Sequence, residues 1–103
     1  MPILAIQHLP GATADIAAEI SAEAAVRGDP PAGLLVHAAA QTEVGLQVID
    51  IWQHEADLQR FQQDRLGPAS AVVFARRGIT GPPPPPLQVT QVIELITAPG
   101  RST

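Results

Sequence analysis

The sequence predicts a small α+β domain with the element order β-α-β-β-α-β, in which a four-stranded antiparallel sheet carries its helices on one face. Three observations support this prediction. Two apolar runs in the middle of the chain are joined by a short polar link that contains glycine, the pattern of a β-hairpin. A segment with apolar residues at helical spacing lies on each side of that hairpin. A further apolar run lies near each end of the chain and supplies the outer strands.

The first strand is predicted at residues 2–9, where the run PILAIQHL ends at the turn signal Pro10-Gly11. A helix should follow, with Thr13 as its N-cap and Gly28 as the residue that ends it. Its apolar stripe would lie on the sheet and recurs every four residues, at Ile16, Ile20 and Ala24.

The hairpin is predicted from residues 33–42 and 45–53, which read GLLVHAAAQT and GLQVIDIWQ. The loop between them would hold either two residues, 43–44, or four, 42–45. Both lengths give the same register between the strands, whereas a three-residue loop would shift one strand by one position.

In that register His37 lies opposite Asp50 and Leu35 lies opposite Trp52. Because residues two apart on a strand share a face, His37, Asp50 and Trp52 are predicted to project from the same side of the sheet. Most of the side chains able to do chemistry are therefore expected on or beside this hairpin.

After the hairpin, a second helix is predicted to begin near His54, with Leu58 and Phe61 on its apolar face. Gly67-Pro68 should interrupt it, since proline is acceptable as the first residue of a renewed helix. The renewed helix should end at Gly78. Its predicted apolar face consists of Ala69, Val72 and Val73.

The last part of the chain contains the proline-rich loop 81–86, whose consecutive prolines favour a stiff polyproline II spacer. A final strand is predicted at residues 87–96, and residues 97–103 are predicted to form a flexible tail. The domain organisation expected is thus one domain, residues 1–96, followed by that tail.

With right-handed crossovers the element order gives a ferredoxin-like sheet. The hairpin carries apolar residues on both of its faces. Helices that cover only one face would leave the apolar side chains of the other face exposed to water. We therefore expect a homodimer in which this second face packs against another copy.

Composition excludes several classes of protein. The chain has 103 residues, no lysine and a net charge of −4, so it lacks the basic patch that would neutralise phosphates, and no nucleic-acid partner is expected. No apolar run approaches the roughly 20 residues needed to span a bilayer, and no basic segment precedes an apolar one at the N-terminus. The sequence therefore predicts a cytoplasmic protein without a membrane partner.

The residue types that are missing restrict the mechanism. The chain contains no Cys, Lys, Tyr or Asn, which rules out a catalytic thiolate, a lysine Schiff base, a phenolic acid and an asparagine oxyanion donor from within the chain. The histidines His8, His37 and His54, the arginines and the carboxylates remain for proton transfer. The histidines are 29 and 17 residues apart, which matches no metal-ligand signature, so no metal is predicted.

The run VIDIWQHEADLQRF, residues 48–61, together with the element order, resembles the dimeric α+β barrel superfamily. Within it the chain is similar to antibiotic-biosynthesis-type monooxygenases and their small uncharacterised relatives. The residues that carry the resemblance are Asp50, Trp52, Glu55, Ala56 and Leu58. The resemblance implies a small-molecule pocket between the sheet and the helices of each subunit.

The chain also departs from this pattern. Members of the branch often carry a histidine nine residues beyond the tryptophan, where this chain has Phe61, and cofactor-free oxygenases of this kind often use an asparagine, which is absent. Because the haem-degrading relatives use that histidine as the iron ligand, Phe61 argues against haem, and no cofactor is expected. Other relatives resemble polyketide cyclases, dehydratases and isomerases that move protons without a cofactor.

Two hypotheses follow. In the first, a cofactor-independent enzyme acts on a small aromatic or polyketide-like molecule: His37, oriented by Asp50, removes a proton, and the product is oxygenated, cyclised or isomerised. In the second, the protein is a non-catalytic dimeric module that binds a small ligand, and the His37–Asp50 pair is structural. The predicted substrate-binding residues are Trp52 and Phe61 in the pocket wall, and Arg65 and Gln91 near a developing enolate.

Overall fold

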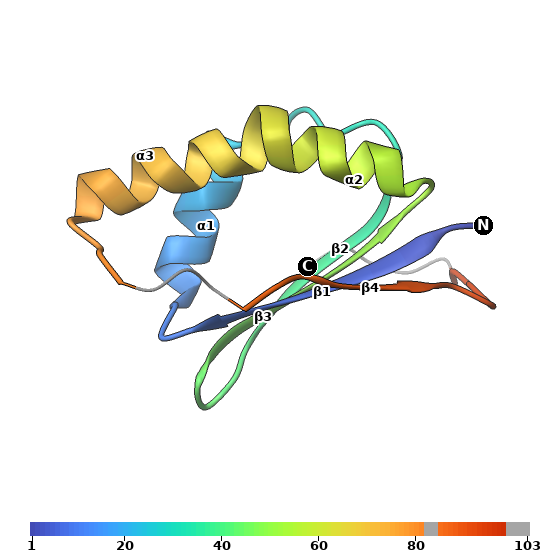
Figure 1. Ribbon diagram of the computed structural model, residues 1–103, viewed down its shortest axis with the longest axis horizontal. Helices are drawn as coiled ribbons and strands as arrows, with labels where there is room; N and C mark the ends of the chain where they lie inside the picture. Colours follow the sequence, from blue (N-terminus) through green and yellow to red (C-terminus); the bar gives the residue numbers. More distant parts are fainter. Residues whose placement is uncertain (82–84, 99–103) are drawn as a thin grey trace.

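The computed structural model describes residues 1–81 and 85–98, so residues 82–84 of the predicted proline-rich loop and 99–103 of the predicted tail lie outside the described residues. The four strands form one sheet in the order β2-β3-β1-β4, with every neighbouring pair antiparallel. The helices all lie on one face of this sheet (Figure 1), which confirms the predicted ferredoxin-like α+β fold. The elements are β1 (Ile3–Pro10), α1 (Ala14–Glu23), β2 (Leu34–Gln41), β3 (Gly45–Trp52), α2 (Glu55–Phe61), η1 (Gln62–Leu66), α3 (Gly67–Arg77) and β4 (Gln88–Gln91).

The hairpin of β2 and β3 has the predicted register at its centre, where His37 lies opposite Asp50. Thr42 and Gly45 exchange backbone hydrogen bonds, which leaves Glu43 and Val44 as a two-residue loop. Gly45 has a φ of +154°, and a Cβ there would collide with the backbone at the end of β1, so glycine is required at this position.

The predicted pairing of Leu35 with Trp52 is wrong. Leu34 lies opposite Trp52, and the register shifts between Leu34 and Val36. Leu35 is therefore the extra residue of a β-bulge, and its side chain is 44% exposed. The bulge affects only the start of β2, so the His37–Asp50 pairing is preserved.

Helix α1 begins as predicted, with the Thr13 hydroxyl accepting a hydrogen bond from the Ile16 N–H. It ends at Glu23, so the prediction that Gly28 ends it is wrong. Ala24 is the C-cap, and Ala25 adopts a left-handed conformation with a φ of +58°. The buried side chain of Ala24 and a hydrogen bond from Arg65 to its carbonyl stabilise this earlier end.

The predicted interruption at Gly67-Pro68 takes the form of a wide turn within a continuous helical segment from α2 through η1 to α3. The N–H of Gly67 donates to the carbonyl of Gln62, five residues earlier, as in a π-helix. Because Pro68 lacks an N–H and its ring crowds the preceding turn, a wider turn at this point accommodates it in the first turn of α3. Gly78 ends α3 with a φ of +66°, as predicted.

Strand β4 contains only Gln88–Gln91, so the prediction of a strand over residues 87–96 is too long. Its last link to β1 is a hydrogen bond from the Val92 N–H to the Pro2 carbonyl. Pro2 has no N–H to return, so the ladder ends there. The apolar residues beyond it, Ile93, Leu95 and Ile96, are exposed.

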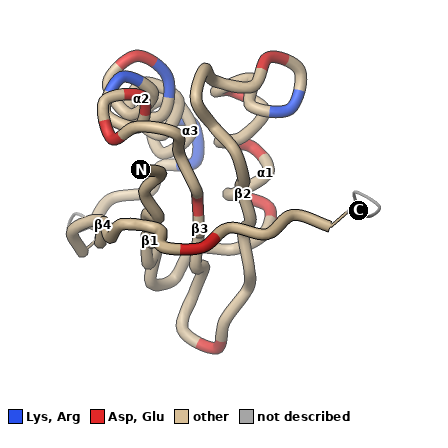
Figure 2. Tube along the Cα trace, turned by 90° about the vertical axis from the view of Figure 1, so that its right-hand side faces the viewer, with Lys and Arg blue, Asp and Glu red and all other residues tan. Residues whose placement is uncertain are grey.

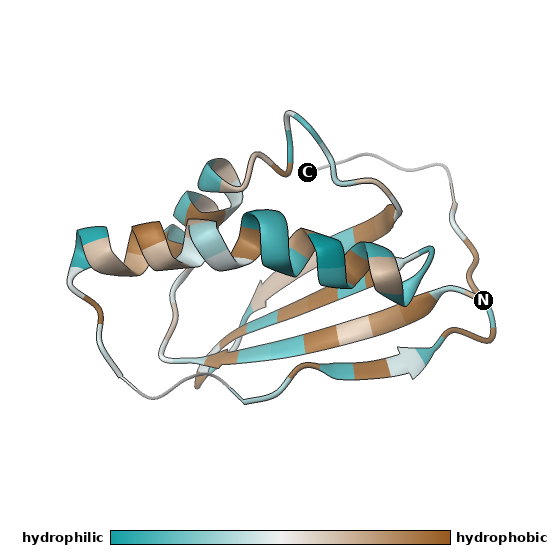
Figure 3. Ribbon diagram, turned by 45° about the horizontal axis from the view of Figure 1, so that its top comes forward, coloured by the Kyte–Doolittle hydropathy of each residue, from teal (hydrophilic) through white to brown (hydrophobic). Residues whose placement is uncertain are grey.

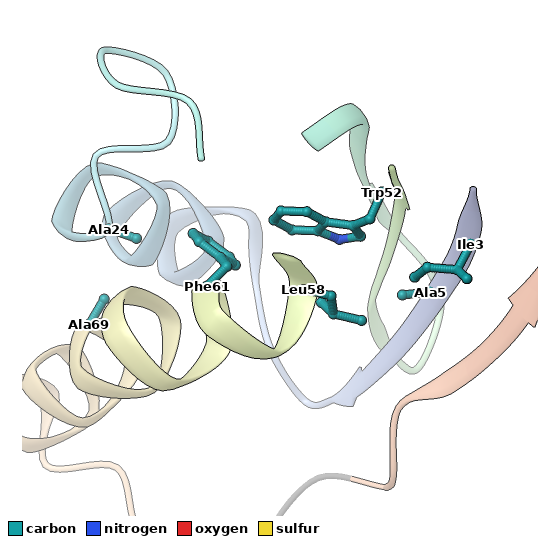
Figure 4. Packing of buried hydrophobic residues seen from close by; sticks show 7 residues of the cluster. All are labelled: Ile3, Ala5, Ala24, Trp52, Leu58, Phe61 and Ala69. Atoms are coloured by element: carbon teal, nitrogen blue, oxygen red, sulfur yellow. The ribbon is translucent and has the colours of Figure 1, made fainter. Parts of the chain in front are cut away.

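The core lies between one end of the sheet and α2 (Figure 4). Trp52 is fully buried, and its ring centroid lies 5.4 Å from that of Phe61 on α2. Farther along the helical segment, Val73 is fully buried but Val72 is 43% exposed, so the predicted apolar face of α3 is correct in part. The other buried members of the main cluster are Ile3, Ala5, Ala24, Leu58 and Ala69. Within the described residues, every helix is too short or too polar to cross a membrane.

Candidate functional site

The face of the sheet that meets the helices is called the inner face below. Trp52 defines it, because its ring packs against Phe61 of α2. Asp50 and Val48 share this face by strand alternation, and their neighbours on β2 are His37 and Ala39. The structure therefore places His37, Asp50 and Trp52 on one side of the sheet.

His37 and Asp50 form the polar centre of this face. The His37 Nδ1 and the Asp50 Oδ1 are 2.6 Å apart, and the two side chains are 36% and 13% exposed. Asp50 is the only Asp, Glu, Lys or Arg in the four strands. Figure 2 agrees, because the described arginine positions lie on the helices and their loops. The Asp50 carboxylate thus contacts the His37 imidazole, and no strand carries a Lys or Arg that could pair with it instead.

The hydrogen bond that His37 donates to Asp50 raises the pKa of His37, and the charge of Asp50 acts in the same direction, against the lowering effect of partial burial. An ionised Asp50 accepts the Nδ1–H, so the neutral imidazole keeps its lone pair on Nε2. Nε2 can therefore accept a proton from a molecule bound on the inner face. This is the arrangement of an oriented general base.

Trp52, two residues after Asp50 on the same strand, contributes a buried polar group to the same face. Its side chain is completely buried, and its indole Nε1–H has no hydrogen-bond partner among the described residues. A buried N–H without an acceptor is uncommon in folded proteins. Figure 4 shows the indole between the strands and the first turn of α2, with its benzene edge towards Phe61.

The other predicted site residues are divided between two places. Gln91 lies opposite Ile3 on β1 and therefore on the inner face, at the exposed β4 edge. Arg65 is on η1, where its guanidinium donates to the Asp29 carbonyl at 2.6 Å, to the Asp29 carboxylate at 3.2 Å and to the Ala24 carbonyl at 3.4 Å. Arg65 thus holds the end of α1, away from the His37–Asp50 pair.

Two recesses lie beside Arg65, with volumes of about 360 and 190 Å³. They are lined by helix and loop residues, and His37, Asp50, Trp52 and Gln91 are absent from both linings. These recesses and the His37–Asp50 pair are therefore separate features of the surface. We place the candidate site at the pair because the groups able to do chemistry lie there.

The inner-face residues nearest the pair towards the hairpin loop, Ala39, Gln41 and Val48, were not singled out from the sequence. The alternation that places His37 on the inner face also places Ala39 and Gln41 there, but their residue types carry no catalytic signal. The Gln41 Nε2 donates to the Gly45 carbonyl at 2.8 Å. Ala39 and Gln41 are exposed and Val48 is half-buried, which only the structure shows.

The remaining histidines lie elsewhere. His8 is exposed on β1 and points away from the inner face by alternation, and His54 is the exposed N-cap residue of α2. In residues 1–81 and 85–98 no three His, Cys, Asp or Glu side chains are grouped so that they could hold a metal ion.

Comparisons with solved structures identify the fold. The chain is similar to Rv0793 from Mycobacterium tuberculosis, with a TM-score of 0.62 and 14% identity over 94% of this chain and 100% of that one. It is also similar to a candidate antibiotic biosynthesis monooxygenase from Chloroflexus aurantiacus J-10-fl, with a TM-score of 0.60 and 16% identity over 91% and 95% of the two chains. No family model and no curated protein matches the sequence. The chain has the ferredoxin-like fold of antibiotic biosynthesis monooxygenase-like proteins.

Proposed function

We propose that this protein is a cofactor-independent enzyme that removes a proton from a small aromatic or polyketide-like molecule, and that the resulting enolate or phenolate reacts with dioxygen. One oxygen atom then forms a carbonyl at the attacked carbon, and the other leaves as water together with the two hydrogens of that carbon. His37 is the base and Asp50 orients it. The single observation that carries the proposal is the 2.6 Å contact between His37 Nδ1 and Asp50 Oδ1 on the inner face, which leaves Nε2 for the substrate.

Other features of the site support this proposal. Gln91 lies on the same face and could donate its amide to an enolate. Oxygenation is favoured over cyclisation or isomerisation by the likeness to a candidate antibiotic biosynthesis monooxygenase. All three outcomes share the proton abstraction by His37.

Turnover should depend on pH in a defined direction. His37 acts as a base only when neutral, and its raised pKa means that kcat/KM should rise on the alkaline side of the ordinary histidine value of about 6.5. Asp50→Asn removes the main cause of the raised pKa. The rise in kcat/KM should then move to lower pH, with a lower plateau because the imidazole is no longer held in one tautomer.

The test is proton exchange at carbon. Anthrone, a tricyclic ketone with acidic C10 hydrogens, is incubated in deuterated buffer with the protein, and loss of the C10 proton signal is followed by NMR. His37→Gln should lower the protein-dependent rate by about 10²–10⁴-fold, the usual contribution of a positioned base. His8→Gln is the matched control and should keep the full rate, because His8 lies on the opposite face.

Equal rates for the wild type and His37→Gln would overturn the assignment of His37 as the base. If anthrone instead bound without any exchange in the wild type, the second hypothesis, a non-catalytic binding module, would be favoured. In that case the 2.6 Å pair would serve to satisfy two polar groups within the fold.

We also propose a homodimer that covers the face of the sheet away from the helices. By alternation this outer face carries Leu4, Ile6, Ile49 and Ile51 on the two central strands, all half-buried within the single chain. A second copy would remove these side chains from water. Light scattering should give twice the chain mass, and Ile49→Arg should give the monomer.

A further inference from the structure

We infer that His8 makes the proposed homodimer sensitive to acid, so that the two copies separate when this histidine takes up a proton. His8 is on β1, and by alternation its side chain projects from the outer face, the side of the sheet away from the helices (Figure 1). This inference rests on the homodimer proposed above and adds the group that regulates the contact between the copies.

The outer face has an uncharged, apolar centre that extends over three strands. Leu4 and Ile6 of β1 lie opposite Ile51 and Ile49 of β3, and Val36 of β2 lies opposite Ile51 in turn. All five are half-buried in the single chain. A twofold dimer uses the same patch on both copies, so an apolar patch of this kind can cover itself.

His8 is at the border of this patch. It follows Ile6 on the same face of β1 and lies opposite Gln47 of β3, whose neighbour on β2 is Ala40. Its side chain is exposed in the single chain, and no hydrogen bond or ion pair of the described residues involves its imidazole. A second copy that covers the apolar centre would therefore also take water from His8.

No charged side chain of the strands faces His8. The titratable side chains of the four strands are His8, His37 and Asp50, and the last two are paired on the inner face. The second copy presents the same outer face, so it brings another His8 and no carboxylate from its strands. Glu43 of the hairpin loop is exposed four residues before Gln47.

The remaining charged groups near β1 belong to its other end. The Val92 N–H donates to the Pro2 carbonyl, which places the N-terminal amine and Glu94 near the start of the strand, whereas His8 is close to its end. A protonated His8 covered by an uncharged face would lose its hydration without gaining a carboxylate partner. Proton uptake therefore favours the separated chains, and the dimer should weaken as pH falls.

Sedimentation velocity of the full chain over a dilution series measures the dimer Kd at about pH 8 and about pH 5, with circular dichroism to verify the fold at both values. If His8 titrates near 6.5 in the free chain and stays neutral in the dimer, two protons oppose association at the lower pH. The largest possible rise in Kd is then about 10³-fold, and we expect at least tenfold.

His8→Gln keeps a polar side chain that cannot take up a proton, so its Kd should differ by less than about twofold between the two pH values. His54→Gln is the matched control, because His54 is an exposed histidine at the start of α2, and it should keep the wild-type pH dependence. His37→Gln should also keep it, which separates this effect from titration of the inner-face pair. His8→Arg, charged at both values, should dimerise weakly throughout.

The role of His8 is overturned if the wild-type Kd is the same at both pH values, or if His8→Gln retains the pH dependence. It is also overturned if His8→Arg dimerises at about pH 8 as tightly as the wild type, because position 8 would then remain in water in the dimer. Each of these results leaves the homodimer in place. A wild-type chain that is monomeric at both pH values would reject the homodimer together with the switch.

Discussion

The inner face of the sheet contains two unlike regions, a packed end under α2 and a more exposed region on β2. This region, called the shelf, consists of His37, Ala39 and Gln41 with Val48 and Asp50 of β3. In the packed end, Trp52 and Ile3 are buried beneath Leu58 and Phe61. In the shelf, Ala39 and its neighbours remain exposed beneath α1. Figure 3 shows apolar positions along the strands, interrupted by hydrophilic ones.

The helix that covers each region explains the contrast. α2 contributes a leucine and an aromatic ring, whereas α1 reads ADIAAEISAE and consists mainly of small and polar residues. Two of the three aromatic residues in the chain, Trp52 and Phe61, meet in the packed end. A domain with so few large side chains can fill only part of its interior, and the residues of β2 beside α1 stay exposed.

The largest expected effect tests the packed end. Trp52→Ala should lower the free energy of unfolding by about 3–5 kcal/mol, the usual loss for removing a large buried aromatic side chain. Urea denaturation followed by circular dichroism measures it. Gln41→Ala in the shelf should change the free energy of unfolding by less than about 1 kcal/mol. Equal losses would mean that the shelf is as tightly packed as the core.

The next effect concerns the attachment of α1. Arg65→Ala removes hydrogen bonds to Asp29 and to the carbonyl at the end of α1, and should cost about 1–2 kcal/mol in the free energy of unfolding. Arg60→Ala is the control, because the exposed Arg60–Asp57 pair should contribute less than about 0.5 kcal/mol. A loss for Arg60→Ala as large as that for Arg65→Ala would contradict this account of how α1 is held.

Stability should also depend on pH through the shelf. The folded-state pKa of His37 is raised, so its contribution is fully present below the unfolded-state value of about 6.5 and is lost as pH rises through the folded-state pKa. Relative to His37→Gln, the wild type should therefore lose stability between mildly acidic and mildly alkaline pH. A constant difference between the two across this range would mean that the pair does not shift the pKa.

The smallest effect concerns the ion pairs that join α1 to α3. Glu19 contacts Arg77 at 2.7 Å and Arg76 at 2.9 Å, and the hydrogen bond from Arg77 holds the pKa of Glu19 below its usual value. Glu19→Gln should lower Tm less than Arg65→Ala does, and the difference from the wild type should shrink at about 1 M salt, where the Debye length is about 3 Å. A salt-independent loss would indicate a packing role for Glu19 instead.

Much of the fold was predictable because its signals are local. The Thr42–Gly45 link specified the hairpin loop, and its even length placed His37 opposite Asp50. Thr13, Pro68 and Gly78 each lie where a cap, a first helical turn or a left-handed residue is needed. The candidate base and its carboxylate followed from that register, and the structure places them in contact.

The incorrect predictions share a different origin. The bulge at Leu35, the early end of α1 at Glu23 and the short β4 all depend on a partner that is distant in sequence. Arg65 donates a hydrogen bond to the carbonyl of Ala24, at the end of α1. Pro2 accepts a hydrogen bond from Val92 but has no N–H to donate, so the pairing of β4 with β1 ends there. A local pattern contains no information about such partners, so propensity alone extended α1 and β4 too far.

The sequence by itself determined the element order, the register at the centre of the hairpin and the exclusion of thiolate, Schiff-base and phenolic chemistry, because these depend on residue identity and on spacing along the chain. Only the tertiary structure decided that Arg65 holds the end of α1 and that Ala39 lies open beside His37. Exposure is a property of what packs above a residue, and packing depends on the volumes of side chains brought together from distant segments.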